Sequence, residues 1–591
     1  MYPSHEAQTR PQSPSTVDTS PDRAPRASGI TVDSVCERLG ISRPIYDLLM
    51  GSYFDNMTAF SLFRPGSIEP KFAMMQYHSD AEALIAAMFS FSARHARDVS
   101  DTDIPSPAYF AQIASSKLDE SVDRYGDLRP PFWLLQAGIL VTFYQLTRSV
   151  RSRSWKKLGD CIRYAYDTNL HLVDANVNPD QEEHPDLDKW VLMEERRRAW
   201  WAVWEMDVFA STIRRLPTAI DPSLNLTKLP VSDACWFKRT YQPSCFLVED
   251  CGARWKALAR SGNQCAKAWF IVINSLMRNT QRLVYPAGSH QSLGTTNHDE
   301  LSIMANCLYC TVTSLPSGLA YQGETLTFRG GFRADGTSPR QAHADLYSIH
   351  LMTQLCRFMI YHHKICARAP WLSRQKDKAP PQLSGEATSE WSNYISASDE
   401  IVSIVRSSAR DHFRFVNPFL ANTLWFAAAA QCACRVFGPP SFNKRLTGSN
   451  LDLLRLTIDR FIAFWDGMGN LGGKLARIET GLQNLMNKPG SDIRGNGDSL
   501  PTDLGHLPEQ STAAVPQPQT DAVPDGHGPA VQLSTAWPAP FIPEFQVGDV
   551  STQTFALPGG GHGHDFFAAP LDFSPFGLED FLMAGMDGQY L

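Results

Sequence analysis

Long apolar runs are absent from this 591-residue sequence. A helix that crosses a membrane needs about 18 or more consecutive apolar residues. The two most apolar windows, residues 132–144 and 424–434, are shorter than that and contain polar side chains. The N-terminus also lacks the basic start and apolar stretch that mark a signal peptide. We therefore expect a soluble, intracellular protein with no membrane contact.

A compact cysteine framework is missing as well. The twelve cysteines are scattered along the chain, most of them inside apolar helical patterns. Cys307 and Cys310 have a Cys-x-x-Cys spacing but no second pair and no nearby histidine, while Cys356 and Cys366 lie too far apart on one predicted helix to share a site. Such cysteines are more typical of small buried side chains than of metal ligands or disulfides. We expect no metal site among them.

Signatures of enzyme active sites are absent too. The sequence has no GxSxG, Walker A, HExxH or dinucleotide-binding fingerprint. A helical isoprenoid-type synthase would need clustered aspartates such as DDxxD to hold magnesium, and none occurs. The glycine-rich stretch at residues 559–564 has no strand before it and is interpreted as a spacer. The chain is therefore not expected to be an enzyme.

Positive charge is absent from the last part of the chain. Residues 501–591 contain eleven Asp and Glu and no Lys or Arg, so 54 basic and 61 − 11 = 50 acidic residues remain in the first 500. Twelve prolines lie between Pro501 and Pro575. This composition predicts a Pro/Gly-rich linker and an acidic tail over residues 487–591. Residues 1–29, rich in Ser and Pro, are likewise predicted to be disordered.

What the chain does contain is helical periodicity, from residue 30 to residue 486. Apolar residues recur at i, i+3, i+4 and i+7 in successive windows, whereas alternating strand-like runs are scarce. The fold class predicted for this body is all-α. The windows are residues 81–95, 131–147, 155–172, 190–213, 251–283, 342–365, 395–408, 418–436 and 451–486.

Two windows inside this body form ordered signatures. Residues 137–171 read as a helical hairpin whose second helix carries a Trp, a Leu-Gly pair, an Arg and a terminal Leu-His. Residues 194–217 then run through consecutive arginines, a Trp-Trp pair, an Asp and a terminal Pro. The signature residues are Trp155, Gly159, Arg163, His171, Arg196, Arg197, Trp200, Trp201, Asp207 and Pro217.

These two windows resemble the regulatory domain, or middle homology region, of fungal zinc-cluster transcription factors. Arg215 and Leu216 depart from the Gly-Arg that is usual at the final turn. The resemblance covers roughly residues 45–480 and implies an all-helical regulatory domain in a nuclear transcription regulator. It also implies a role, as in many relatives, in activating a fungal metabolic or biosynthetic gene set.

The zinc that the family carries has no ligand set in this chain. Six closely spaced cysteines are needed to hold two zinc ions, and only Cys36 precedes residue 161. One hypothesis is that an upstream exon encodes the cluster. Residues 34–49 could mimic a helix-turn-helix, but they offer mainly Arg43 and Tyr46 for reading bases. We interpret them as the entry helices of the regulatory domain, and expect contact with promoter DNA to be indirect, through a DNA-binding partner or a homodimer.

The arginines of the second signature have two interpretations. Arg196, Arg197 and Arg198 beside tryptophans could form a nucleic-acid surface. Alternatively, Glu194 and Glu195 pair with them at i,i+3 and i,i+4 while the tryptophans face the core. The sequence favours the second interpretation. Asp207, on an apolar helix, is correspondingly expected to form a structural ion pair with an arginine.

The acidic tail ends in a segment that interleaves aromatic and acidic residues. This pattern is typical of disordered activation segments that bind transcriptional coactivators. A short helix starting at Pro575 would place apolar anchors on one face; the alternative is a helix docked on its own body. The predicted anchors are Phe573, Phe576, Leu578, Phe581 and Leu582. A second functional hypothesis for the whole chain is a helical ligand-sensing or partner-binding protein that binds no DNA itself.

Overall fold

A computed structural model of the chain describes residues 29–487, except 98–102, 177–184, 215, 285–295, 332–337, 368–384, 438–442 and 468–470. Within these residues the secondary structure is helical, apart from an isolated parallel bridge between Leu326 and Ser408. The predicted all-α class is therefore confirmed. None of the described helices is long and apolar enough to cross a membrane. The predicted activation anchors lie outside the described residues.

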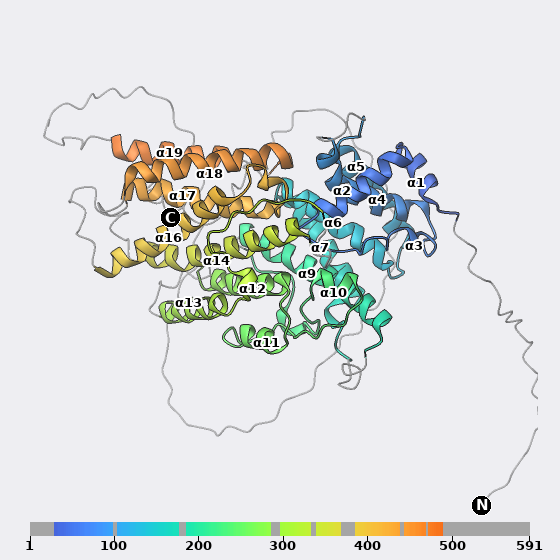
Figure 1. Ribbon diagram of the computed structural model, residues 1–591, viewed down its shortest axis with the longest axis horizontal. Coiled ribbons are helices and arrows are strands. Elements are labelled where there is room, and N and C mark those ends of the chain that lie inside the picture. Colours follow the sequence, from blue (N-terminus) through green and yellow to red (C-terminus); the bar gives the residue numbers. More distant parts are fainter. Residues whose placement is uncertain are drawn as a thin grey trace, which may run out of the picture. The chain divides into compact units, whose positions relative to one another are not determined.

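The first part of the body is built around one helix that is buried on every side. This helix, α4 (His78–Ala96), packs against α2 (Arg43–Asn56), α5 (Pro107–Tyr125) and α6 (Phe132–Arg148) (Figure 1). Its alanines and serines allow these neighbours to approach closely, and 18 of its 19 residues are buried. The remaining elements of this part are α1 (Val32–Leu39), α3 (Glu69–Phe72), α7 (Ser152–Asp167) and the short 3-10 helix η1 (Leu170–Leu172).

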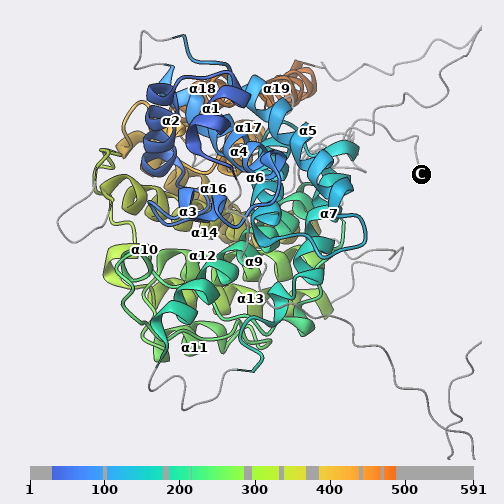
Figure 2. The same cartoon turned by 90° about the vertical axis from the view of Figure 1, so that its right-hand side faces the viewer.

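The central part is organised by a 28-residue helix, α9 (Leu187–Arg214), which contacts α6, α7 and α12 (Ala266–Val284). Between α9 and α12 the chain forms η2 (Pro222–Leu224), α10 (Asp233–Phe237) and α11 (Arg254–Arg260). α13 (Thr296–Thr313) and η3 (Ser317–Leu319) follow. In Figure 2, α13 and α11 lie below α9, in the lower part of the view.

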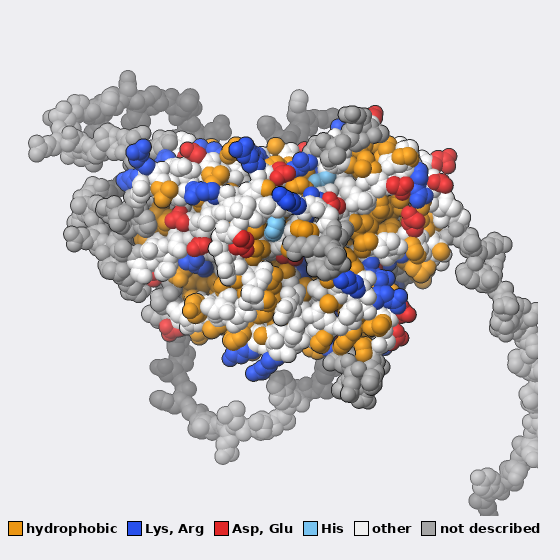
Figure 3. All heavy atoms as spheres, viewed as in Figure 1, with side chains coloured by type: hydrophobic (Ala, Val, Ile, Leu, Met, Phe, Trp, Pro, Cys, Tyr) orange, Lys and Arg blue, Asp and Glu red, His pale blue; other side chains and the backbone are white. Residues whose placement is uncertain are grey.

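The last part continues the packing through α14 (Pro339–Ala367), α16 (Gly385–Ser407), α17 (Ala421–Phe437), α18 (Lys444–Trp465) and α19 (Leu471–Asn487). Two short 3-10 helices, η4 (His412–Arg414) and η5 (Pro418–Leu420), lead into α17. A large apolar cluster joins buried residues from Ile30 to Ile478, so all three parts contribute to one core. On the face drawn in Figure 3, acidic and basic side chains are interspersed with apolar ones.

Three predicted helices are interrupted in the structure. The window 155–172 breaks at Asn169, 251–283 breaks at Gly262, and 451–486 breaks at Asp466, each of which has a positive φ. The last break is followed by Gly467, where a Cβ would lie 2.6 Å from Cα of Arg148. Periodicity runs through such breaks because both halves face the same core, and so it does not reveal them.

The helix-turn-helix mimic belongs to this core, as its interpretation as entry helices predicts. α1 ends at Gly40, whose φ of 65° closes the turn before α2. Leu39, Tyr46 and Leu49 are completely buried. Arg43 remains at the surface, where the carboxylates of Asp47 and Glu69 lie 3.0 and 3.6 Å from its guanidinium.

Candidate functional site

The two sequence signatures meet in space. His171, at the end of the first signature, lies against Trp200 of the second, with ring centroids 6.1 Å apart. Tyr166 completes this aromatic contact at 5.7 Å from Trp200. Trp200 and the neighbouring Trp201 are buried, and the indole N–H of Trp201 donates to the carbonyl of Lys228. The tryptophans therefore face the core, as predicted.

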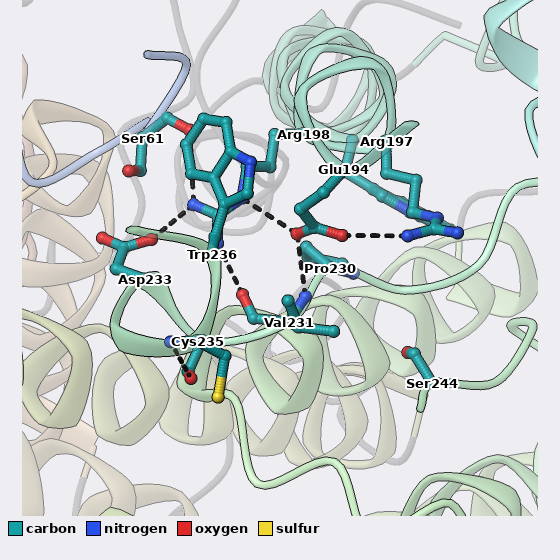
Figure 4. A network of polar contacts seen from close by, with 12 residues as sticks. Ser61, Glu194, Arg197, Arg198, Pro230, Val231, Asp233, Cys235, Trp236 and Ser244 are labelled. Carbon is teal, nitrogen blue, oxygen red and sulfur yellow. Dashed lines mark hydrogen bonds and ion pairs between the residues drawn. The ribbon is translucent and has the colours of Figure 1, made fainter. Parts of the chain in front are cut away.

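A buried charge network occupies the start of α9 (Figure 4). Glu194 accepts from Arg198 Nε at 2.9 Å with one oxygen and from Arg197 Nη1 at 3.3 Å with the other. These are the i,i+4 and i,i+3 pairs that the sequence predicts. The first oxygen of Glu194 also accepts the backbone N–H of Val231 at 2.9 Å, which attaches the segment before α10 to α9.

Two further carboxylates complete the network from outside the helix. Asp174 binds Arg197 with both oxygens, at 2.9 Å to Nε and 2.5 Å to Nη2. Asp233 pairs with Arg198, whose guanidinium also lies 4.2 Å from the ring centroid of Trp236. Burial lowers the pKa of both arginines, but hydrogen bonds and charge from these carboxylates outweigh it and raise the pKa above its ordinary value.

Glu195 and Arg196 bind other partners, so the predicted pairing of Glu195 with an arginine is wrong. Glu195 accepts instead from Lys71 Nζ and from Gln136 Nε2, both at 2.8 Å. Arg196 donates to the carbonyl of Thr168, the C-cap of α7, where a cation satisfies an unpaired helix carbonyl. The arginine cluster thus joins α9 to its neighbours rather than forming a surface for nucleic acid.

Asp207 has a different partner from the one that the sequence suggests. Its oxygens accept the backbone N–H groups of Ala219 at 3.2 Å and Ile220 at 2.8 Å, and the Ser211 hydroxyl at 3.3 Å. Burial raises its pKa, and these hydrogen bonds oppose the rise. Asp207 therefore does not form the expected ion pair with an arginine. Its carboxylate instead stabilises the turn that follows α9, because the backbone amides of that turn face it.

The other signature residues lie at the edges of this arrangement. The guanidinium of Arg214 lies 5.1 Å from the ring centroid of half-buried Trp155. Arg163 is exposed and extends over Gly159, where a Cβ would come within 3.1 Å of its Nη1. Pro217 is exposed, and its carbonyl accepts weakly from Ser211. These residues lie where α7 packs against the end of α9 and against the turn that follows α9.

No group of three or more His, Cys, Asp or Glu that could hold a metal occurs among the residues that the structure describes. Cys307 is buried on α13, and burial raises the pKa of its thiol. Burial likewise raises the pKa of Cys356 to about 12 and keeps that thiol protonated. Nothing in the described geometry therefore assigns these cysteines to zinc.

Sequence reasoning missed the carboxylates that neutralise the arginines. Asp174 lies 23 positions from Arg197, and Asp233 lies 35 positions from Arg198. Two adjacent arginines on an apolar helix with one glutamate in reach do signal that further acceptors are needed. That signal does not say which acidic residues supply them.

Comparison with known proteins identifies the part of the chain that contains this network. Residues 50–308 match the family model described as "Fungal specific transcription factor domain". This family consists of transcription factor domains, not enzymes. No solved structure is significantly similar to the chain.

Several characterised fungal regulators are similar over a short segment. Transcription factor tazR of Aspergillus terreus is 27% identical over 120 residues, which is 20% of this chain and 18% of the relative. The tropolone cluster transcription factor tropK of Talaromyces stipitatus is 29% identical over 104 residues, 18% of each chain. The pigment biosynthesis transcriptional activator pigB of Monascus ruber is 28% identical over 102 residues, 17% of this chain and 18% of the relative.

These alignments span about a fifth of the length of each relative. They are therefore evidence for a shared domain and not for similarity over the whole length of the proteins. The family match agrees with the resemblance carried by the two signatures, and the structure brings those signatures together around α9. Residues 50–308 of this chain are therefore a fungal specific transcription factor domain.

Proposed function

We propose that the chain is a nuclear transcription regulator that activates a fungal metabolic or biosynthetic gene set. The observation that carries this proposal is the family match over residues 50–308. The similar proteins add support, because one of them is an activator of pigment biosynthesis. In this proposal the helical body is the regulatory part and the acidic tail recruits coactivators.

Promoter contact is assigned to a partner. Arg197 and Arg198 are paired with carboxylates inside the body, and Arg196 donates to the carbonyl of Thr168. Arg43 of the helix-turn-helix mimic lies beside acidic side chains. None of these four arginines is available to phosphates without breaking an ion pair or a hydrogen bond. A DNA-binding partner or a homodimer would therefore bring the chain to its promoters.

The test is genetic. Deletion of the gene in its host should lower the transcripts of a group of biosynthetic genes, and restoring the full-length gene should return them. Chromatin immunoprecipitation of the tagged full chain should enrich the promoters of the same genes. Unchanged transcripts together with no promoter enrichment would contradict the proposal.

The second candidate function, a ligand-sensing protein that contacts no promoter, is favoured by one observation. A cavity lies beside Arg198 at the edge of the charge network. A ligand that raises the melting temperature of the chain, with no promoter enrichment in the immunoprecipitation, would select this function over regulation of transcription.

A further inference from the structure

The cavity beside Arg198 has a volume of about 250 Å³. It is bordered by residues 58–61, α9, residues 230–237, the start of α12, the end of η3 and the start of α14. Three aromatic side chains, Phe60, Trp201 and Phe237, contribute apolar wall. Pockets that hold a drug-sized ligand usually measure about 300–1,000 Å³, so this one suits a smaller molecule.

The positively charged groups of the lining are already engaged. Arg198 donates to Glu194, Asp233 and the carbonyls of the chain around it, as Figure 4 shows for the two carboxylates. Lys267 donates to the carbonyl of Ala59 at 2.8 Å and to Glu205 at 3.0 Å. The second oxygen of Glu205 accepts from Asn417. An anionic ligand would have to displace these partners.

Asp345 on α14 is a carboxyl group of the lining to which neither Arg198 nor Lys267 donates a hydrogen bond. Its one hydrogen-bond donor among the described residues is Gln341 Nε2, at 2.9 Å from Oδ1. Lys267 and Arg198 act on it only through longer-range charge, and Asp233 opposes them. Burial with so little compensation raises the pKa of Asp345 to about 7.

The charged side chains of the lining also indicate that Asp345 lacks a counter-charge. Arg198 and Lys267 bring two positive charges, whereas Glu205, Asp233 and Asp345 bring three carboxyls. The free hydrogen-bonding capacity of the cavity is therefore that of an acceptor. Aromatic faces within about 6 Å of a cation stabilise it further.

We propose that this cavity binds a small protonated organic amine, whose ammonium group pairs with Asp345 while its apolar body packs against Phe60, Trp201 and Phe237. Binding would join α9, α10 and α14, because all three contribute to the lining. Binding itself does not depend on the proposed function; only the role of the amine as an effector of transcription rests on it.

The experiment compares three probes that share one ring and differ in charge. Purified full-length chain is titrated by calorimetry at pH 8 with 2-phenylethylamine, with neutral 2-phenylethanol and with anionic phenylacetate. The amine should bind saturably at millimolar concentrations or below, and at least about tenfold more tightly than either analogue, because a half-buried carboxylate without a neighbouring counter-charge favours a charged donor.

Two variants locate the site. Asp345→Asn removes the charge but keeps an acceptor for Gln341, and it should weaken amine binding by at least about tenfold. Ala342→Phe adds bulk from an exposed position in the lining, so it should block the amine without overpacking the core. The matched control is Asp399→Asn, which alters a carboxyl group on α16 outside the cavity that also has a raised pKa.

Circular dichroism melting checks that each variant is folded. Loss of amine binding in both cavity variants, with binding retained in Asp399→Asn, supports the site. Equal amine binding by wild type and a folded Asp345→Asn or Ala342→Phe variant overturns it. Tighter binding of phenylacetate than of the amine, or no amine binding by the wild type, overturns the ligand class. None of these outcomes depends on transcription, so the proposed function stands or fails separately.

Discussion

Glu194 lies at the centre of the buried charge network and has one partner, the backbone of Val231, that helical spacing does not predict. Its two oxygens serve Arg197, Arg198 and the backbone of Val231, and its side chain is fully buried. Two arginines this deep in the protein are tolerated because carboxylates face them from several directions. The cost of removing one carboxylate is then the cost of a buried, uncompensated cation.

We predict that Glu194→Gln lowers the free energy of unfolding by about 3–5 kcal/mol. Urea denaturation of the full chain measures the change. The control is Glu120→Gln, which breaks the exposed pairs of Glu120 with Lys117 and Arg124. That variant should lose about 1 kcal/mol or less, because water screens exposed ion pairs. Equal losses in both variants would show that the network contributes no more than a surface pair.

At the scale of elements, the break between α18 and α19 depends on a close approach to α6. Gly467 follows the left-handed residue Asp466, and its missing Cβ leaves room for the backbone of Arg148 at the end of α6. A helix continuing through this point would direct α19 away from α17, against which it packs. The glycine therefore permits the turn that leads from α18 toward α19.

Gly467→Ala should destabilise the chain by about 1–3 kcal/mol, because the new Cβ would lie 2.6 Å from Arg148 Cα and one backbone must move. Gly448→Ala is the matched comparison, since Gly448 lies inside α18 with nothing within 4 Å of its missing Cβ. It should stabilise by about 0.5–1 kcal/mol. Thermal melting of both variants measures the difference. A shift in the same direction for both would contradict the close-approach argument.

The acidic tail provides the second prediction about an element. Residues 565–591 fused to an unrelated DNA-binding domain should activate a reporter, and the body alone should not. Each large apolar anchor that becomes buried in a coactivator groove contributes about 1.5–3 kcal/mol. Replacing Phe581 and Leu582 with Ala should therefore abolish activation. Replacing Glu579 and Asp580 with Gln and Asn should weaken it less.

The ranking of the two tail variants distinguishes the alternatives. A greater loss on removing the acidic groups would indicate a purely electrostatic contact. A fusion with no activity would return the segment to the alternative of a helix docked on its own body. Immunoblotting of the fusions ensures that they are compared at equal expression.

At the scale of the whole molecule, the chain as written should show no zinc-dependent, sequence-specific DNA binding. A zinc-cluster reader needs six thiolates in one compact unit, and the sequence has no such unit. Gel-shift assays of the purified full chain, with and without a chelator, test this. Binding to a defined site that the chelator abolishes would overturn the prediction.

The sequence by itself determined those features that depend on neighbours along the chain. Helical periodicity predicts α4, α6, α9 and α14 to within a few residues, because the pattern of a helix face repeats every turn. The pairs of Glu194 with Arg197 and Arg198 follow from the same spacing. The ordered signatures around Trp155 and Trp200 were enough to identify the domain that the family match confirms.

The tertiary structure alone decided which distant groups meet. Asp174, which precedes α9, and Asp233, which follows it, reach the arginines only because the chain packs against α9 on both sides of it in the sequence. The amides of Ala219 and Ile220 reach Asp207 because the chain turns back after α9. The cavity around Asp345 is assembled from six separate segments of the chain, and of these only α9 carries a sequence signature. Charge must be compensated wherever it is buried, but the partner is whichever group packing brings near, and packing is a property of the whole fold.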